Sequence, residues 1–123
     1  MRSYRELVAW QVAFDLARQI RLKTEGFPKE ELFGLRSQMR RSAVSIPSNI
    51  AEGAGRSSKK DFEQFVSIAR GSLNELETQY LLAMALNFLK EDVEMEAFFE
   101  RLFGLLNGLR NSPNAHAQSH AKR

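Results

Sequence analysis

The sequence predicts an all-α protein, folded as an antiparallel up-down-up-down four-helix bundle. Apolar residues recur at spacings of three and four in four separate segments, which is the period of an amphipathic helix. No segment shows the strict alternation of apolar and polar residues that is typical of a strand, and only three prolines occur in 123 residues. Four amphipathic helices with short loops pack most simply when each runs antiparallel to the one before it.

The first helix is expected to begin at Ser3. Ser3 and Glu6 have the spacing of a capping box, in which both side chains bond to free amides of the first turn. Gly26 is expected to end the helix just after Glu25, because glycine readily adopts the left-handed conformation found at helix ends. The predicted core stripe is Leu7, Trp10, Ala13, Phe14, Ala17 and Ile20.

The second helix is expected to begin at Pro28, whose fixed φ suits a first helical position. Its predicted core stripe is Leu32, Leu35, Met39, Ala43, Ile46 and Ile50. Pro47 lies within this stripe and removes one helical hydrogen bond, so we expect the helix to be kinked or broken near Pro47. Gly53 and Gly55 are expected to end it.

The third helix is expected to follow Ser57 and Ser58, which are good N-cap residues. Its predicted core stripe is Phe62, Phe65, Val66, Ala69, Leu73, Leu76, Tyr80 and Met84. The fourth helix is expected to begin around Glu91 or Asp92, because the helix dipole favours acidic residues in the first turn. Its predicted core stripe is Phe98, Phe99, Leu102, Leu105, Leu106 and Leu109.

The composition excludes several classes of protein. There is no cysteine, which excludes disulfides and thiolate metal sites. The longest apolar run, residues 80–89, is far short of the roughly 20 residues that span a bilayer. The N-terminus does not have the pattern of a signal peptide, so we expect a cytoplasmic protein without a membrane partner. Residues 1–110 are expected to form the bundle, and the small polar residues 111–123 a disordered tail.

Patterns typical of catalysis and metal binding are scarce. His116 and His120, the only histidines, have a spacing that suits two metal ligands, but no third ligand lies nearby in the sequence. Neither a phosphate-binding loop nor a Gly-x-Ser-x-Gly motif occurs. Glu52 either forms an ion pair with Arg56 or fixes the turn, or else acts as a general base, for which no partner is evident. We predict that the protein is not an enzyme and has no cofactor.

Two helices carry more apolar surface than one bundle core uses. Val8 and Val12 lie roughly opposite the main stripe of the first helix. The end of the third helix is apolar all round and includes Leu81, Leu82, Ala85, Leu86, Phe88 and Leu89. Either the fourth helix and the N-terminal turns cover these residues, or they form an oligomer interface.

Gly34 and Gly71 fall inside predicted helices, where each costs roughly 1 kcal/mol relative to alanine. Close approach of two helix backbones is the expected reason, and a functional backbone contact is the alternative.

Basic residues gather in the middle of the sequence. Residues 28–60 carry seven Lys or Arg against three Glu, a net charge of +4. They form either a solvated face with ion pairs to neighbouring helices or a surface that contacts the phosphates of RNA or DNA. No aromatic residues are interleaved with them, so base stacking is not indicated. The candidate nucleic-acid-binding residues are Lys29, Arg36, Arg40, Arg41, Arg56, Lys59 and Lys60.

Five strings resemble one known family. They are residues 7–11 (LVAWQ), 27–31 (FPKEE), 35–43 (LRSQMRRSA), 44–53 (VSIPSNIAEG) and 69–77 (ARGSLNELE). In order, from about residue 4 to residue 90, they resemble the bacterial four-helix-bundle proteins encoded in intervening sequences of 23S rRNA genes. The string SIPSNIAEG is the most specific part. Of the basic candidates, Lys59 and Lys60 fall outside the strongest strings.

The resemblance implies a left-handed bundle that assembles into a ring, a homopentamer. It also implies a relation to the accessory proteins of diversity-generating retroelements, which present a basic surface to nucleic acid and to a reverse transcriptase. It implies no catalytic residues. Our leading hypothesis is therefore a ring-forming, non-enzymatic protein that binds structured RNA or DNA without reading its sequence. The alternative is a protein-interaction scaffold whose basic face pairs with an acidic protein partner.

Overall fold

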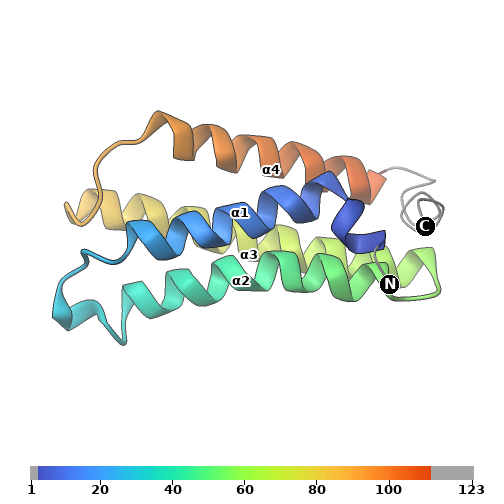
Figure 1. Ribbon diagram of the computed structural model, residues 1–123, viewed down its shortest axis with the longest axis horizontal. Coiled ribbons are helices and arrows are strands. Elements are labelled where there is room, and N and C mark those ends of the chain that lie inside the picture. The colour runs from blue at the N-terminus through green and yellow to red at the C-terminus, as the bar shows by residue number, and fades with distance from the viewer. Residues whose placement is uncertain (1–2, 112–123) are drawn as a thin grey trace.

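The computed structural model describes residues 3–111, and that part of the chain is all-α. Its four α-helices are α1 (Val8–Lys23), α2 (Leu35–Ala54), α3 (Lys59–Ala85) and α4 (Val93–Asn111). Successive helices run in opposite directions (Figure 1). α1 contacts α2, α2 contacts α3, α3 contacts α4 and α4 contacts α1, so the helices surround one core. The predicted four-helix bundle is confirmed.

The predicted tail lies outside the described residues, except for Asn111, which is the last residue of α4. His116 and His120 also lie outside them. Within residues 3–111, none of the helices has the length and apolar character needed to cross a membrane.

The core follows the predicted stripes of α3 and α4, whereas the predicted stripe of the first helix is correct for Leu7, Ala13 and Ile20 but wrong for Phe14. Phe62, Tyr80 and Phe99 are buried in the centre of the bundle. In α1, Val12 is only 6% exposed, whereas Phe14 is 54% exposed. The expectation that Val12 points away from the core is therefore wrong. The buried stripe of α1 is Ala9, Val12, Ala13, Leu16 and Ile20.

Two helices begin later than the sequence predicts. The 3-10 helix Ser3–Glu6 precedes α1, whose N-cap residue makes no side-chain cap bond, so the predicted capping box does not start α1. The 3-10 helix Lys29–Glu31 precedes α2, so Pro28 is not its first residue. Gly34 is the N-cap residue of α2 and not an interior residue. Leu32 lies before α2 and is 43% exposed instead of joining the core stripe.

The helix ends depend on polar side chains and on one left-handed asparagine. α1 ends before Thr24, whose buried hydroxyl donates to the carbonyl of Ile20 over 2.8 Å. No glycine in the described part has a positive φ, so the predicted left-handed stop at Gly26 is wrong. After α3, Asn87 has a φ of 64°, and the amide of Phe88 donates back to the last turn over 2.9 Å. This is the Schellman pattern, which asparagine can adopt in place of glycine.

α2 is one continuous helix through Pro47. The predicted break is therefore wrong, and a kink stays a prediction. Within this part of α2, the Asn49 side-chain amide donates to the Ser45 carbonyl over 2.8 Å. The hydroxyls of Ser45 and Ser72 share a 2.8 Å hydrogen bond that joins α2 to α3. α2 contacts both α1 and α3, and this packing opposes the roughly 3 kcal/mol cost of an interior proline.

Close approach between helices occurs at Gly53, a glycine that the sequence indicated only as a helix end. A Cβ at Gly53 of α2 would lie 2.8 Å from the Cβ of Phe65 in α3. At Gly71 no atom lies within 4 Å of such a Cβ, so the expected close approach there is wrong. At Gly34 the nearest atom belongs to the side chain of Glu31, 2.9 Å away in the same loop, so two helices do not meet there either.

Candidate functional site

The predicted nucleic-acid-binding residues do not form one surface. One group lies at or just before the start of α2: Lys29, Arg36 and Arg40. A second group, the turn cluster, lies at the turn into α3: Arg56, Lys59 and Lys60. The 20 residues of α2, at about 1.5 Å each, separate the two groups by roughly 30 Å. Figure 1 shows that they lie at opposite ends of the bundle.

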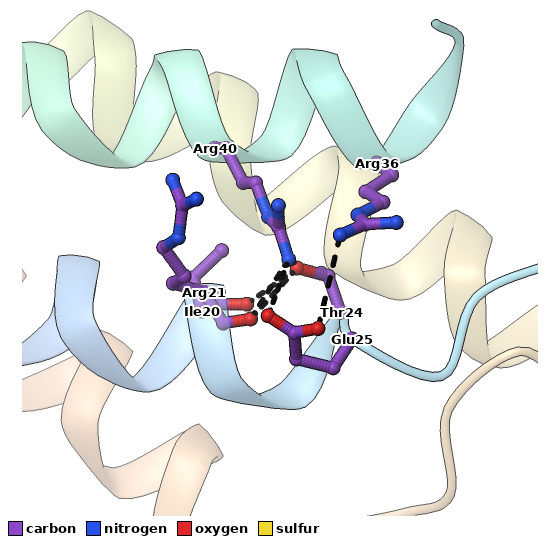
Figure 2. Close-up of polar contacts among 6 residues, drawn as sticks. All are labelled: Ile20, Arg21, Thr24, Glu25, Arg36 and Arg40. Atoms are coloured by element: carbon purple, nitrogen blue, oxygen red, sulfur yellow. Dashed lines mark hydrogen bonds and ion pairs between the residues drawn. The ribbon is translucent and has the colours of Figure 1, made fainter. Parts of the chain in front are cut away.

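Arg40 joins the end of α1 to α2. Its Nε donates to the hydroxyl of Thr24 over 2.9 Å, and its Nη2 donates to the carbonyl of Arg21 over 3.1 Å (Figure 2). The same Nη2 lies 3.5 Å from the carboxylate of Glu25, and Arg36 reaches that carboxylate at 3.8 Å. The side chains of Arg40 and Arg36 are only 17% and 21% exposed. Both guanidinium groups therefore hold α2 against the end of α1, which leaves little of either for phosphate.

Arg40 lies beside two other positively charged side chains. Burial, followed by repulsion from Arg36 and Arg21, lowers the pKa of Arg40 from its ordinary value, and Glu25 opposes this shift. Arginine nevertheless stays charged in proteins. Because one carboxylate compensates several guanidinium groups, removing Glu25 would leave the start of α2 strongly repulsive.

In the turn cluster, Arg56 is held by two contacts. Its Nη2 lies 2.9 Å from the carboxylate of Glu52, one helical turn earlier. Its guanidinium carbon lies 4.9 Å from the ring centroid of Phe65, a cation–π contact. The ion-pair interpretation of Glu52 is therefore confirmed. The Arg56 side chain is still 46% exposed, so it can meet a further anion from solvent.

The lysines of the turn cluster open α3. The hydroxyl of Ser58 accepts the amide of Asp61 over 3.0 Å, which confirms the predicted start of this helix. Lys59 forms a 3.1 Å ion pair with Glu63 and stays half exposed. Lys60 is exposed and forms no ion pair in the described part of the chain. The helix dipole adds positive potential at this end of α3.

The remaining predicted residues lie apart. Lys29 is exposed in the loop before α2, and Arg41 is exposed on α2 beside a small crevice against α3. Within residues 3–111, no group of three His, Asp or Glu side chains is placed to hold a metal ion.

An apolar groove between α1 and α2, which the sequence did not indicate, has a volume of about 690 Å³. We call it the α1/α2 groove. The ring of Trp10 lies 5.4 Å from that of Tyr4 and 5.1 Å from that of Phe14. Leu22 and Val44 on its walls are each 57% exposed. The prediction missed this groove because it assigned Trp10 and Phe14 to the core.

The predicted oligomer interface is available only in part. Val8 is exposed, as are four residues at the end of α3: Leu81, Leu82, Ala85 and Leu86. Phe88 and Leu89 are partly buried against the core, and the ring of Phe88 lies 5.4 Å from that of Phe27. Val12 is buried, as described above, and is therefore not available to a partner.

Residues 5–108 match a family model described as 23S rRNA-intervening sequence protein. The matched range includes all of α1, α2 and α3 and most of α4. No curated protein matches the chain.

Proposed function

The chain belongs to the 23S rRNA-intervening sequence protein family, and we propose that it is a non-enzymatic, ring-forming protein that binds structured RNA or DNA through its turn cluster. The turn cluster is the observation that carries this proposal. It is the place where several of the predicted cations are both exposed and close together in the chain. Lysine and arginine beside a helix N-terminus suit phosphate oxygens, which carry no information about base sequence.

The turn cluster of a single copy supplies few phosphate contacts, so tight binding requires several copies acting together. Each phosphate that a cation neutralises on duplex DNA contributes a slope of about −0.9 in log K against log salt. A ring presents one turn cluster per subunit, and linked sites bind with an avidity that exceeds the affinity of one. Arg36 and Arg40 are left out of the proposed contact set because their guanidinium groups face Glu25.

The test is a salt titration on two duplexes of unrelated sequence. We expect the wild type to bind both equally. The variant Lys59→Ala/Lys60→Ala should bind both more weakly, with a slope shallower by about 0.9 for each phosphate that is no longer neutralised. Lys90→Ala/Arg101→Ala removes the same charge at exposed positions outside the candidate set and is the matched control. An unchanged slope in the folded Lys59→Ala/Lys60→Ala variant would contradict the proposal.

A scaffold for an acidic protein partner is the second candidate function, because carboxylates pair with the same exposed lysines and arginines. The salt titration separates the two candidates. Absence of wild-type binding to either duplex at low salt would leave the scaffold as the better explanation of the turn cluster.

Self-assembly is supported by exposed apolar residues on more than one side of the bundle. Leu22 and Val44 on α1 and α2, and Leu81 and Leu82 on α3, are each about half exposed. Contiguous exposed apolar surface on a small protein usually marks an interface. Light scattering should give a multiple of the 14.1 kDa chain mass, with five copies favoured by the family resemblance. A 14.1 kDa particle at micromolar concentration would contradict this part of the proposal.

A further inference from the structure

We infer that the α1/α2 groove of one copy receives the α3/α4 face of a second copy, with the arginines of the groove against the carboxylates of that face. The inference rests on the proposed self-assembly and adds which two surfaces meet. The α3/α4 face surrounds a hollow of about 380 Å³ that is lined by Glu77, Tyr80, Leu81, Glu96, Glu100 and Phe103.

The two surfaces are complementary in charge. Arg18 and Arg21 border the α1/α2 groove, as does Glu25, whose carboxylate already pairs with Arg36 and Arg40. Glu77, Glu96 and Glu100 border the hollow, and none of these three carboxylates has an ion-pair partner within the described residues. Arg18 is paired only with Asp15, through a 2.8 Å contact whose partners are 61% and 44% exposed. Unpaired carboxylates around one apolar surface and arginines around another favour contact between them.

The apolar parts of the two surfaces are also complementary. Leu81 is 54% exposed beside the hollow, and the α1/α2 groove offers a cavity of about 690 Å³ walled by Phe14, Leu22 and Val44. A single copy leaves all four side chains in water. Contact between the two surfaces would remove them from water together, which is the main favourable term in association.

Part of each surface lies at the same end of the bundle. The ion pair between Lys23 and Asp92, 2.9 Å long, places the end of α1 beside the start of α4. Arg21 lies in the last turn of α1, Glu96 in the first turn of α4 and Leu81 near the end of α3. In Figure 1 these three helix ends lie at the same end of the bundle.

The α3/α4 hollow lies toward this end, beside the level of Arg21, whereas the α1/α2 groove continues along α1 to Tyr4 and along α2 to Ala51. A contact between two different surfaces is heterologous, and it makes a ring when the rotation between copies closes. The proposed contact is of this kind, and closure into a ring of five is favoured by the family resemblance alone.

Charge reversal tests the contact. Arg18→Glu/Arg21→Glu and Glu77→Lys/Glu100→Lys should each weaken self-association about 100-fold, because like charges then face each other across the contact. An equimolar mixture of the two variants should associate again, because each reversed surface meets its complement on the other variant. The two variants must alternate, so the mixture should form open or even-numbered assemblies and not a ring of five. The variant that carries all four changes should assemble alone. The measurement is sedimentation velocity across a concentration series, with circular dichroism to verify the fold.

Arg41→Glu/Glu75→Lys is the control for charge reversal itself, because it reverses one arginine and one glutamate beside the α2/α3 crevice, away from both surfaces. It should leave assembly unchanged. Loss of assembly in only one of the two reversed pairs, or failure of the four-change variant to assemble, would overturn the inference. If the wild type assembles and neither reversed pair weakens it, the inference fails while the proposed self-assembly stands. If the wild type is a monomer, both fail.

Discussion

Gly53 sets how closely α2 and α3 pack, because the space for its missing side chain is occupied by Phe65. We expect Gly53→Ala to lower the free energy of unfolding by about 1–3 kcal/mol, the usual cost of overpacking, despite alanine's better helix propensity. Gly71→Ala is the internal control. It meets no atom within 4 Å and should raise the free energy of unfolding by up to about 1 kcal/mol. Urea titrations of both variants measure the two free energies of unfolding. Equal changes for the two substitutions would contradict the predicted overpacking at Gly53.

Arg40 stabilises the fold, so its substitution should lower the free energy of unfolding. Arg40→Ala should lower the free energy of unfolding by about 1.5–3 kcal/mol, because it removes charged hydrogen bonds from a partly buried side chain. Arg36→Ala should cost less, since the nearest contact of Arg36 with Glu25 is 3.8 Å long. Arg40→Lys should restore little, because lysine lacks the planar fork that reaches Thr24 and Arg21 at once. Thermal melts of the three variants measure their stabilities. Full stability of Arg40→Lys would contradict the structural role assigned to the Arg40 guanidinium group.

On the scale of elements, α4 depends on Asp92 at its start. Oδ1 of Asp92 accepts the amides of Glu94 over 3.0 Å and Met95 over 3.2 Å, and Oδ2 pairs with Lys23 of α1 over 2.9 Å. The hydrogen bond with Lys23, helped by the two backbone amides, lowers the pKa of Asp92 below its ordinary value of 3.8, against the effect of burial. One side chain therefore both caps α4 and attaches it to α1.

This lowered pKa predicts a dependence of stability on pH. The carboxylate of Asp92 stabilises the fold fully above the ordinary pKa of 3.8, and that contribution is lost as the pH falls through the lower pKa of the folded state. Asp92→Asn keeps a capping side chain but has no such titration. Wild-type melting temperature should therefore fall more steeply than that of Asp92→Asn as the pH drops below 3.8. Parallel curves for the two proteins would contradict this assignment.

At the scale of the whole molecule, assembly should contribute to stability by mass action. If only folded copies associate, the melting temperature of the wild type rises with protein concentration. The variant Lys59→Ala/Lys60→Ala should show the same rise, because neither lysine lines the α1/α2 groove or the α3/α4 hollow. Differential scanning calorimetry across a wide concentration range measures this. A melting temperature that does not depend on concentration would indicate that the folded unit is the single chain.

The sequence by itself determined the features whose signals are local. The period of the apolar residues predicted four helices, and the short polar segments at Ser58 and Asp92 predicted where the last two begin. The ion pair between Glu52 and Arg56 could be predicted for the same reason, because residues four apart on a helix are neighbours. Each of these signals is contained within a few consecutive residues. None depends on which helix comes to lie beside which.

Only the tertiary structure decided the features that depend on how each helix is rotated about its axis. α1 is apolar on more than one side, so its period suits a stripe through Phe14 as well as one through Val12, and contacts with the neighbouring helices bury Val12. That choice exposes Phe14 and thereby creates the α1/α2 groove. The partner of Arg40 lies 16 residues away at Thr24, and Gly53 meets Phe65 across two helices. Contacts of this kind form when packed helices settle against one another, and no local pattern in the chain records them.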